Sequence, residues 1–187
     1  MKKSLLLALI VLCSASLAFA QLPGAVGLFA DNGGVSCNLT DSPGIAYVYV
    51  IHQWTDGATA SEFSVSFPAG CMTHLADTSP FALKSGLFLT GTSIPYQSCL
   101  THPIYLGSML FSTAGICPPC TYMTVVENPN SLPAPAAGEV YVVDCTPGSP
   151  QLMKGTGGEL IINPIQGCEC DVPAEDTTWG QVKALFE

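Results

Sequence analysis

The pattern of hydrophobic and polar positions along the chain predicts β-strands. Residues 62–68 read EFSVSFP, in which Phe63, Val65 and Phe67 alternate with other residues, as in a strand with one buried face. Residues 45–54 (IAYVYVIHQW) are apolar on both faces, which is typical of a central strand. Further segments with a strand-like composition are residues 25–31, 85–90, 104–111, 121–126, 139–144 and 159–162.

Turn-forming sequences separate these segments. DNGG, DSPG, TDGA, ENPN, CTPGSP and KGTGG all lie between predicted strands. About eight short strands at this spacing, with no convincing amphipathic helix among them, predict an all-β fold. We expect a β-sandwich that is immunoglobulin-like or cohesin-like, two classes that the sequence does not separate. The side chains expected in its core are Phe29, Val48, Val50, Trp54, Phe63, Val65, Phe67, Leu106, Leu110, Val125 and Val142.

The N-terminal segment has the features of a secretory signal peptide. Lys2 and Lys3 precede a short apolar run, and the small-x-small sequence Ala18-Phe19-Ala20 follows it. The run is too short to cross a bilayer, and no later segment is long and apolar enough to do so. We therefore expect residues 1–20 to be removed by cleavage after Ala20, which leaves a secreted protein in the extracellular space or periplasm.

The C-terminal segment differs in character from the rest of the chain. We expect residues 21–167 to form the sandwich domain and residues 168–187 to form a tail pinned by its cysteines. Trp179, Val182 and Phe186 fall at the spacing i, i+3 and i+7 of a short helix. A helix of about ten residues is marginal in isolation, so this tail is expected to dock on its own sandwich, on a partner or on an anchoring apparatus.

Composition and charge limit the possible partners. The chain has no arginine, and beyond residue 20 it keeps only Lys84, Lys154 and Lys183 against 14 carboxylates, a formal charge of 3 − 14 = −11. Nucleic acids and anionic lipid surfaces are therefore excluded as partners, because both are bound mainly through Lys and Arg. With only 10% charged residues, the surface is suited to a protein partner, a neutral glycan or self-association.

Eight cysteines beyond the signal peptide predict four disulfide bonds. Their even number and the oxidising compartment favour this interpretation, although about 105 pairings are possible. The CPPC sequence at residues 117–120 also permits a redox site, and together with CEC at residues 168–170 it permits a zinc site. A β-branched segment follows CPPC where a redox motif needs a helix, so two structural disulfides to different partners are expected. The eight cysteines are Cys37, Cys71, Cys99, Cys117, Cys120, Cys145, Cys168 and Cys170.

No catalytic motif is present, and we predict neither an enzyme nor a cofactor. The chain lacks the serine-hydrolase elbow, the zinc-protease helix motif and glycine-rich phosphate loops. Enzymatic activity would require a cleft that holds His74 or His102 beside a carboxylate, whereas His52, in a buried-looking central strand, is expected to be a satisfied or half-exposed histidine and not a catalyst. The neighbouring carboxylates Glu169 with Asp171 and Glu175 with Asp176 are interpreted as solvated residues of the tail.

One weak metal candidate occurs in the DNGG sequence. Asp31 and Asn32 could offer oxygen ligands to a calcium ion in a tight turn. An Asn-Gly hairpin turn is the simpler explanation of the same residues, so no metal is predicted.

The ending TTWGQVKALF resembles a tail of the form TTWG-x-(V/I)-KAL(Y/F), which occurs in uncharacterised secreted proteins of environmental bacteria. Upstream, GLFADNGGVSCNLTD and VYVIHQW with ATASEFSV resemble the body of one such group. This resemblance implies secretion and a recurring tail, but no activity. Many members of the group end in a basic residue, whereas this chain ends in Glu187.

Together these features predict a non-enzymatic, extracellular module for binding, adhesion or surface structure. Binding predicts an exposed aromatic platform, for which Tyr96, Tyr105 and Tyr122 are the candidates. One alternative is a self-assembling subunit that docks through its tail, which predicts an unprotected edge strand. Another is a secreted hydrolase without a recognisable motif.

Overall fold

The structure is a computed structural model that describes residues 22–68 and 70–170, which form β-strands and no helix. Accordingly, no helix that could span a membrane occurs among these residues. The predicted signal peptide and the predicted helical tail, with Trp179, Val182 and Phe186, lie outside the described residues. The twelve strands are β1 (Ala25–Phe29), β2 (Asn38–Leu39), β3 (Gly44–Gln53), β4 (Ala58–Ser66), β5 (Met72–Thr78), β6 (Ser85–Leu87), β7 (Gly91–Leu100), β8 (Ile104–Thr113), β9 (Thr121–Val126), β10 (Glu139–Asp144), β11 (Leu152–Gly157) and β12 (Glu159–Ile162).

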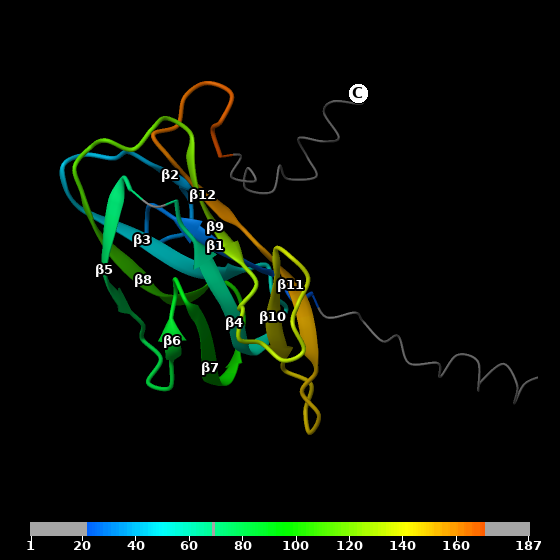
Figure 1. The fold of residues 1–187 in the computed structure, drawn as a ribbon. Coiled ribbons are helices and arrows are strands. Elements are labelled where there is room, and N and C mark those ends of the chain that lie inside the picture. The colour runs from blue at the N-terminus through cyan, green and yellow to red at the C-terminus, as the bar shows by residue number, and fades with distance from the viewer. Residues whose placement is uncertain (1–21, 69, 171–187) are drawn as a thin grey trace, which may run out of the picture.

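The strands form a sandwich whose two layers are joined by shared hydrogen bonds (Figure 1). One layer has the order β5-β8-β3-β1, with antiparallel neighbours, and β1 also pairs in parallel with β11. Strand β4 changes partners along its length, since its first part pairs with β7 and β10 and its last residues pair with β9. Strands β11 and β12 are separated by Gly158 alone, and β12 pairs with β9 and β2.

The core between the layers confirms most of the predicted interior. Val48, Val50, Phe63, Val65, Leu106, Val125 and Val142 are all buried in one hydrophobic cluster. Phe67 is only half-buried and packs at the edge of that cluster. Phe29 is buried as well, but it belongs to a second, small cluster with Cys37 and Ile51 on the opposite face of β1.

Two predicted core residues are instead on the surface. Trp54 is 49% exposed, because it has a left-handed backbone (φ 55°) directly after β3 and leaves the alternation of that strand. Leu110 is half-buried and faces outward, because its neighbours Met109 and Phe111 take the inward positions of β8. Both predictions failed because the alternation is interrupted: the chain leaves β3 at Trp54, and a register shift in the β3–β8 pairing at Leu106 changes the alternation before Leu110.

Four strands were not predicted. Strand β2 has two residues, β5 is rich in polar residues, β7 carries Pro95 opposite Ala60, and β11 is glycine-rich. The KGTGG sequence, predicted as a turn, forms the end of β11 and leads straight into β12. A glycine is needed at residue 157 because a side chain there would overlap the carbonyl group of Val125.

All eight predicted cysteines form disulfides, in four pairs: Cys37–Cys170, Cys71–Cys117, Cys99–Cys145 and Cys120–Cys168. The two cysteines of CPPC therefore bond to different partners, which confirms their structural interpretation. The all-β, disulfide-bonded sandwich is likewise confirmed. The choice between an immunoglobulin-like and a cohesin-like sandwich stays a prediction.

Candidate functional site: a tyrosine face and an adjoining groove

The outward surface of β3, β8 and β5 carries a row of tyrosines, two of them exposed and one half-buried. Alternate residues of β3 point into the core at Val48 and Val50, so Tyr47 and Tyr49 point outward. Tyr105 of β8 lies beside them, opposite Ile51 in the register of the two strands. We define the tyrosine face as the outward residues of these strands: Ile45, Tyr47, Tyr49, Thr73, Ala76, Thr78, Tyr105, Ser108, Leu110 and Ser112.

The aromatic rings of this face lie next to one another in a row. The ring centroids of Tyr47 and Tyr49 are 6.4 Å apart at an interplanar angle of 22°, and those of Tyr49 and Tyr105 are 6.3 Å apart. Tyr47 is 51% exposed and Tyr105 is 37% exposed, although both rings are large and partly apolar. Single exposed apolar residues are ordinary, whereas a contiguous exposed patch marks an interaction surface.

The tyrosine face carries no charged side chain, although the chain as a whole is strongly acidic. Its rows across the three strands are Ile45, Ser112 and Thr73; Tyr47, Leu110 and Ala76; and Tyr49, Ser108 and Thr78. The ten carboxylates of the described residues all lie elsewhere. Aromatic enrichment and depletion of charge are the composition of the buried centre of a protein interface.

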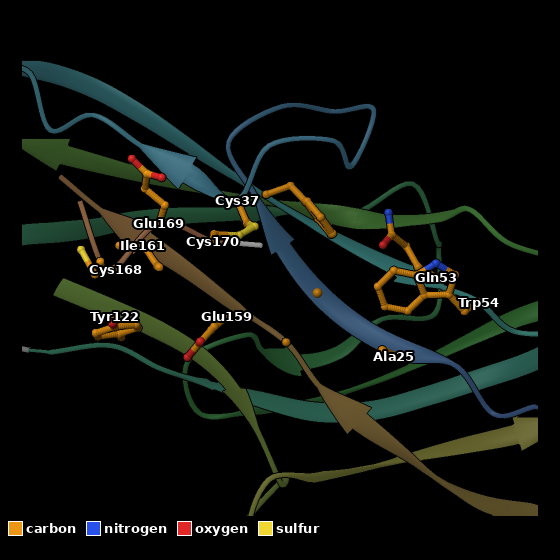
Figure 2. Close-up of a pocket in the computed structure, with 14 residues that line it drawn as sticks. Ala25, Cys37, Gln53, Trp54, Tyr122, Glu159, Ile161, Cys168, Glu169 and Cys170 are labelled. Atoms are coloured by element: carbon orange, nitrogen blue, oxygen red, sulfur yellow. A yellow bond between two sulfur atoms is a disulfide. The ribbon is translucent and has the colours of Figure 1, made fainter. Parts of the chain in front are cut away.

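A groove of about 390 Å³ adjoins this face and crosses β1 and β12. Figure 2 shows Gln53 and Trp54 at one end of it and Tyr122 at the other, with the Cys37–Cys170 disulfide between them. Tyr122 is 43% exposed, so both ends carry an accessible aromatic ring. The lining residues are Ala25, Gly27, Phe29, Cys37, Gln53, Trp54, Tyr122, Gly158, Glu159, Ile161, Gly167, Cys168, Glu169 and Cys170.

The floor of the groove is largely main chain because two glycines meet there. A Cβ atom on Gly158 would lie 3.1 Å from the Cα atom of Gly27, so a side chain at residue 158 would be tightly crowded between β1 and β12. Phe29 and Ile161 supply the apolar part of the floor. The result is a shallow apolar surface with exposed main chain, open to solvent.

The polar rim of the groove is acidic. Glu159 and Glu169 are both exposed and both line the groove. Among residues 22–68 and 70–170, neither carboxylate forms an ion pair, and both lysines of this part are engaged elsewhere. Gln53, at the far end, donates from Nε2 to the carbonyl oxygen of Gly34 at 2.9 Å, which fixes the adjoining loop.

The small cluster of Phe29, Cys37 and Ile51 connects the groove to the tyrosine face. Tyr49 and Cys170 pack against this cluster from its two sides. In the register of β1 and β3, Phe29 lies directly opposite Tyr49. The tyrosine face and the groove are therefore neighbouring parts of one surface.

The three tyrosines predicted as a binding platform have different positions. Tyr105 and Tyr122 are exposed as predicted, one on the tyrosine face and the other at the groove. Tyr96 is 3% exposed, so its prediction is wrong. It lies inside the sandwich, where its hydroxyl group is 3.1 Å from Nδ1 of the buried His52. Burial raises the pKa of its phenol.

Of the two expectations for His52, a satisfied or a half-exposed histidine, the structure shows the first, with the ring fully buried. Its Nε2 atom lies 2.7 Å from the carbonyl oxygen of Pro23, which can only accept, so Nε2 carries the proton and Nδ1 accepts from Tyr96. Burial lowers the pKa of His52; the bond to Pro23 raises it, and the neighbouring His102 lowers it further, so the net change is downward. The neutral ring is therefore part of the core.

His74 lies beside a carboxylate, as the enzyme hypothesis requires, but in a structural cluster. Its Nε2 atom is 2.7 Å from Oδ1 of Asp77. The other oxygen of Asp77 accepts the backbone N–H of Phe88 at 2.7 Å and lies 3.6 Å from Nζ of Lys84. The Asp77 side chain is 2% exposed, and its contacts connect β5 to the residues around β6. The role of this carboxylate is therefore structural.

The other candidate groups show no catalytic arrangement. Nδ1 of His102 lies 3.1 Å from the carbonyl oxygen of Thr55, and neither the groove nor a second pocket, beside Cys71 and Ile116, is lined by a histidine. Among the paired carboxylates of the tail, only Glu169 lies within the described residues, where it lines the groove. The prediction that this protein is not an enzyme stays a prediction.

The Asp31 carboxylate serves its own loop. It accepts the backbone N–H groups of Gly33 at 2.8 Å and of Ser36 at 2.6 Å, besides that of Val35. Partial burial raises the pKa of Asp31, but the bonds from Ser36, Val35 and the two glycines outweigh burial and lower it. No group of three or more His, Cys, Asp or Glu side chains in the described part of the chain could hold a metal ion.

Comparison with known proteins gives only distant likenesses. No protein-family model and no curated protein matches the chain. A cohesin module of a family 33 glycoside hydrolase from Clostridium perfringens gives a TM-score of 0.46 at 8% identity, over 75% of this chain and 98% of that one. The seventh ScaB type I cohesin of Pseudobacteroides cellulosolvens gives 0.45 at 9% identity, over 78% and 96%. At these TM-scores and identities, the likeness defines neither a family nor a partner for this chain.

The sequence pattern did not identify several residues of this surface. It predicts Tyr47 and Tyr49 in a strand with two apolar faces, and it predicts Trp54 in the core. The signal that identifies them is the alternation of Tyr47 and Tyr49 with Val48 and Val50, which assigns the tyrosines to one face. No sequence pattern identifies Glu159 as a groove residue, because the groove forms where β1 contacts β12 and these strands are far apart in the sequence.

Proposed function

We propose that the protein is a secreted, non-enzymatic module that binds a partner protein through its tyrosine face. The observation that supports this most directly is the row of Tyr47, Tyr49 and Tyr105 on an uncharged sheet surface, in which Tyr47 and Tyr105 are exposed and Tyr49 is half-buried between them. Tyrosine is well suited to such a role, since it provides a large contact area with few rotatable bonds and a hydroxyl group for hydrogen bonding. The signal-like N-terminus and the four disulfides support a location outside the cytoplasm.

The contour of the tyrosine face favours a protein over a glycan as the partner. The face lies on three adjacent strands whose outward side chains between the tyrosines are small or medium-sized. The rings of Tyr49 and Tyr105 are inclined by 48° to each other, so they do not form one flat platform for a sugar chain. A protein surface can follow such a contour and exclude water from the rings.

The test compares a double variant and a single control variant with the wild-type secreted protein. Culture-supernatant proteins retained by the immobilised wild type are identified, produced separately and titrated by calorimetry. Tyr47→Ala with Tyr105→Ala should weaken binding at least about tenfold, because central interface tyrosines contribute about 1 kcal/mol or more each. Tyr122→Ala is the matched control, since Tyr122 is similarly exposed but lies at the groove.

Three results would contradict the proposal. The first is a partner whose affinity is unchanged by the double substitution. The second is binding that is lost with Tyr122→Ala or Trp54→Ala and saturated by neutral oligosaccharides, which would identify a glycan site in the groove. The third is concentration-dependent self-association in sedimentation that the double substitution abolishes, which would make a second copy the partner.

A further inference from the structure

The groove between Trp54 and Tyr122 adjoins the tyrosine face but is lined by residues of its own. We propose that the groove is filled by the C-terminal segment of the same chain, residues 171–187, with Trp179 against the apolar floor and Lys183 beside Glu159 and Glu169. Three observations support this assignment: the position at which the described residues end, the match of apolar groups, and the charges.

The first observation is the position of Cys170. It lines the groove, it is bonded to Cys37 in the groove wall, and its backbone N–H donates to Oδ1 of Asn38 at 3.1 Å. The chain therefore leaves the described part of the structure inside the groove. Eight residues lie between Cys170 and Trp179, and this stretch reaches up to about 30 Å when extended, so Trp179 can return to the groove. This tether also raises the local concentration of the segment far above that of any free ligand.

The second observation is the match of apolar groups. The groove is lined on its floor by the largely buried Phe29 and Ile161 and by two glycines, with an accessible aromatic ring at each end. The segment TTWGQVKALF supplies Trp179, Val182 and Phe186, which have no core of their own within so short a stretch. A groove of about 390 Å³ lies within the size range of small-ligand pockets and has room for an inserted indole ring.

The third observation is charge. Lys183 is the only basic residue among residues 171–187, which also carry Asp171, Glu175, Asp176 and Glu187, so the charge argument concerns the position of Lys183 and not the segment as a whole. The two other lysines beyond residue 20 are already engaged. Nζ of Lys154 lies 2.7 Å from Oε2 of Glu139, and Lys84 donates to the carbonyl oxygen of Gly86 at 2.7 Å. Glu159 and Glu169 therefore offer Lys183 two carboxylates that form no ion pair among residues 22–68 and 70–170.

The experiment uses the chain from residue 21 to 187, checked by intact mass, with Trp54→Phe so that Trp179 is its only tryptophan. We expect Trp179 emission at shorter wavelength than in a synthetic peptide of residues 171–187, with several-fold slower quenching by acrylamide. Both properties should be independent of protein concentration. The substitutions Glu159→Lys and Glu169→Lys together should move the emission and the quenching to the values of the peptide, and adding Lys183→Glu should restore them.

A second measurement leaves Trp54 in place. Carbodiimide treatment of the wild type at low concentration should join Lys183 to Glu159 or Glu169 within one chain, as detected by mass spectrometry after digestion. The proposal is overturned if Trp179 is as accessible to acrylamide as in the peptide, or if its emission is unchanged by the substitutions at Glu159 and Glu169. It is also overturned if the protection of Trp179 disappears on dilution. Loss of residues 171–187 from the secreted protein would also overturn it. None of these results depends on a partner of the tyrosine face.

Discussion

The Asp41 carboxylate accepts the backbone N–H of Cys117 through Oδ2, at a distance of 2.7 Å. Asn163 completes this clamp on CPPC, since its Nδ2 donates to the carbonyl oxygen of Cys117 at 2.8 Å and its Oδ1 accepts from the backbone N–H of Asp41. The backbone of Cys120 also donates to the carbonyl oxygen of Asn163. Two side chains distant in sequence thus fix the loop that carries two disulfides.

Replacing Asp41 should destabilise this clamp. Asp41 is buried, so Asp41→Ala leaves the N–H of Cys117 without an acceptor, and we expect a loss of about 1–3 kcal/mol in the free energy of unfolding. Asp41→Asn keeps an oxygen acceptor of the same shape and should lose less. Denaturant unfolding of both variants tests this, and equal losses for the two would argue against the hydrogen bond as the cause.

The disulfide pairing makes a second prediction. Cys71 and Cys117 are 46 residues apart, and in the chain-entropy model a cross-link over that distance stabilises by roughly 4 kcal/mol. Replacing both by alanine should lower the unfolding free energy by an amount of that order. Peptide mapping without reduction should find Cys117 linked to Cys71 and Cys120 linked to Cys168, with no peptide that joins Cys117 to Cys120.

The strands and the disulfide count could be predicted because they depend on local composition and on the parity of the cysteines. Strands β9, β10 and β12 have the predicted bounds. Strand β7 was missed because Pro95 and several small polar residues hide its alternation, which only its pairing with β4 reveals.

The candidate surface could be predicted only in part. Exposed tyrosines were expected, and Tyr105 is among them, but the row with Tyr47 depends on how β3 and β8 align. The groove depends on Gly27 and Gly158 meeting, although 131 residues, 158 − 27, separate them in sequence. No local pattern encodes such a contact, so the acidic rim of Glu159 and Glu169 could not be recognised.

A third prediction concerns Gly157, the last residue of β11, and uses Gly148, which lies before β11, as its control. Gly157→Ala would place a methyl group onto the carbonyl group of Val125, so β9 or β11 must shift. We expect a loss of about 3 kcal/mol, at the upper end for overpacking. Gly148→Ala is the control, because its φ of +77° is unfavourable for alanine but its surroundings are open, and it should cost about 1 kcal/mol. Thermal unfolding that ranks Gly148→Ala as the more damaging would contradict this account.

The buried His52 makes the stability depend on pH. Its pKa in the folded protein lies below the ordinary value of 6.5, mainly because burial disfavours the charged ring. Between the lowered pKa and about 6.5, the unfolded chain binds more protons than the folded one, so stability increases with pH in this window. Its full contribution is present above about pH 6.5 and is lost as the pH falls towards the folded pKa.

We therefore expect the unfolding free energy to fall on acidification from pH 7.5 to 5.5, with a slope of at most about 1.4 kcal/mol per pH unit from this one group. His52→Asn should be less stable at pH 7.5, because the bonds to Tyr96 and Pro23 are altered, and its slope should be flatter than that of the wild type. His102→Gln tests the smaller effect of the neighbouring ring, which also lowers the pKa of His52, so its slope should lie between those of the wild type and His52→Asn. An unchanged slope in His52→Asn would assign the acid sensitivity to another group.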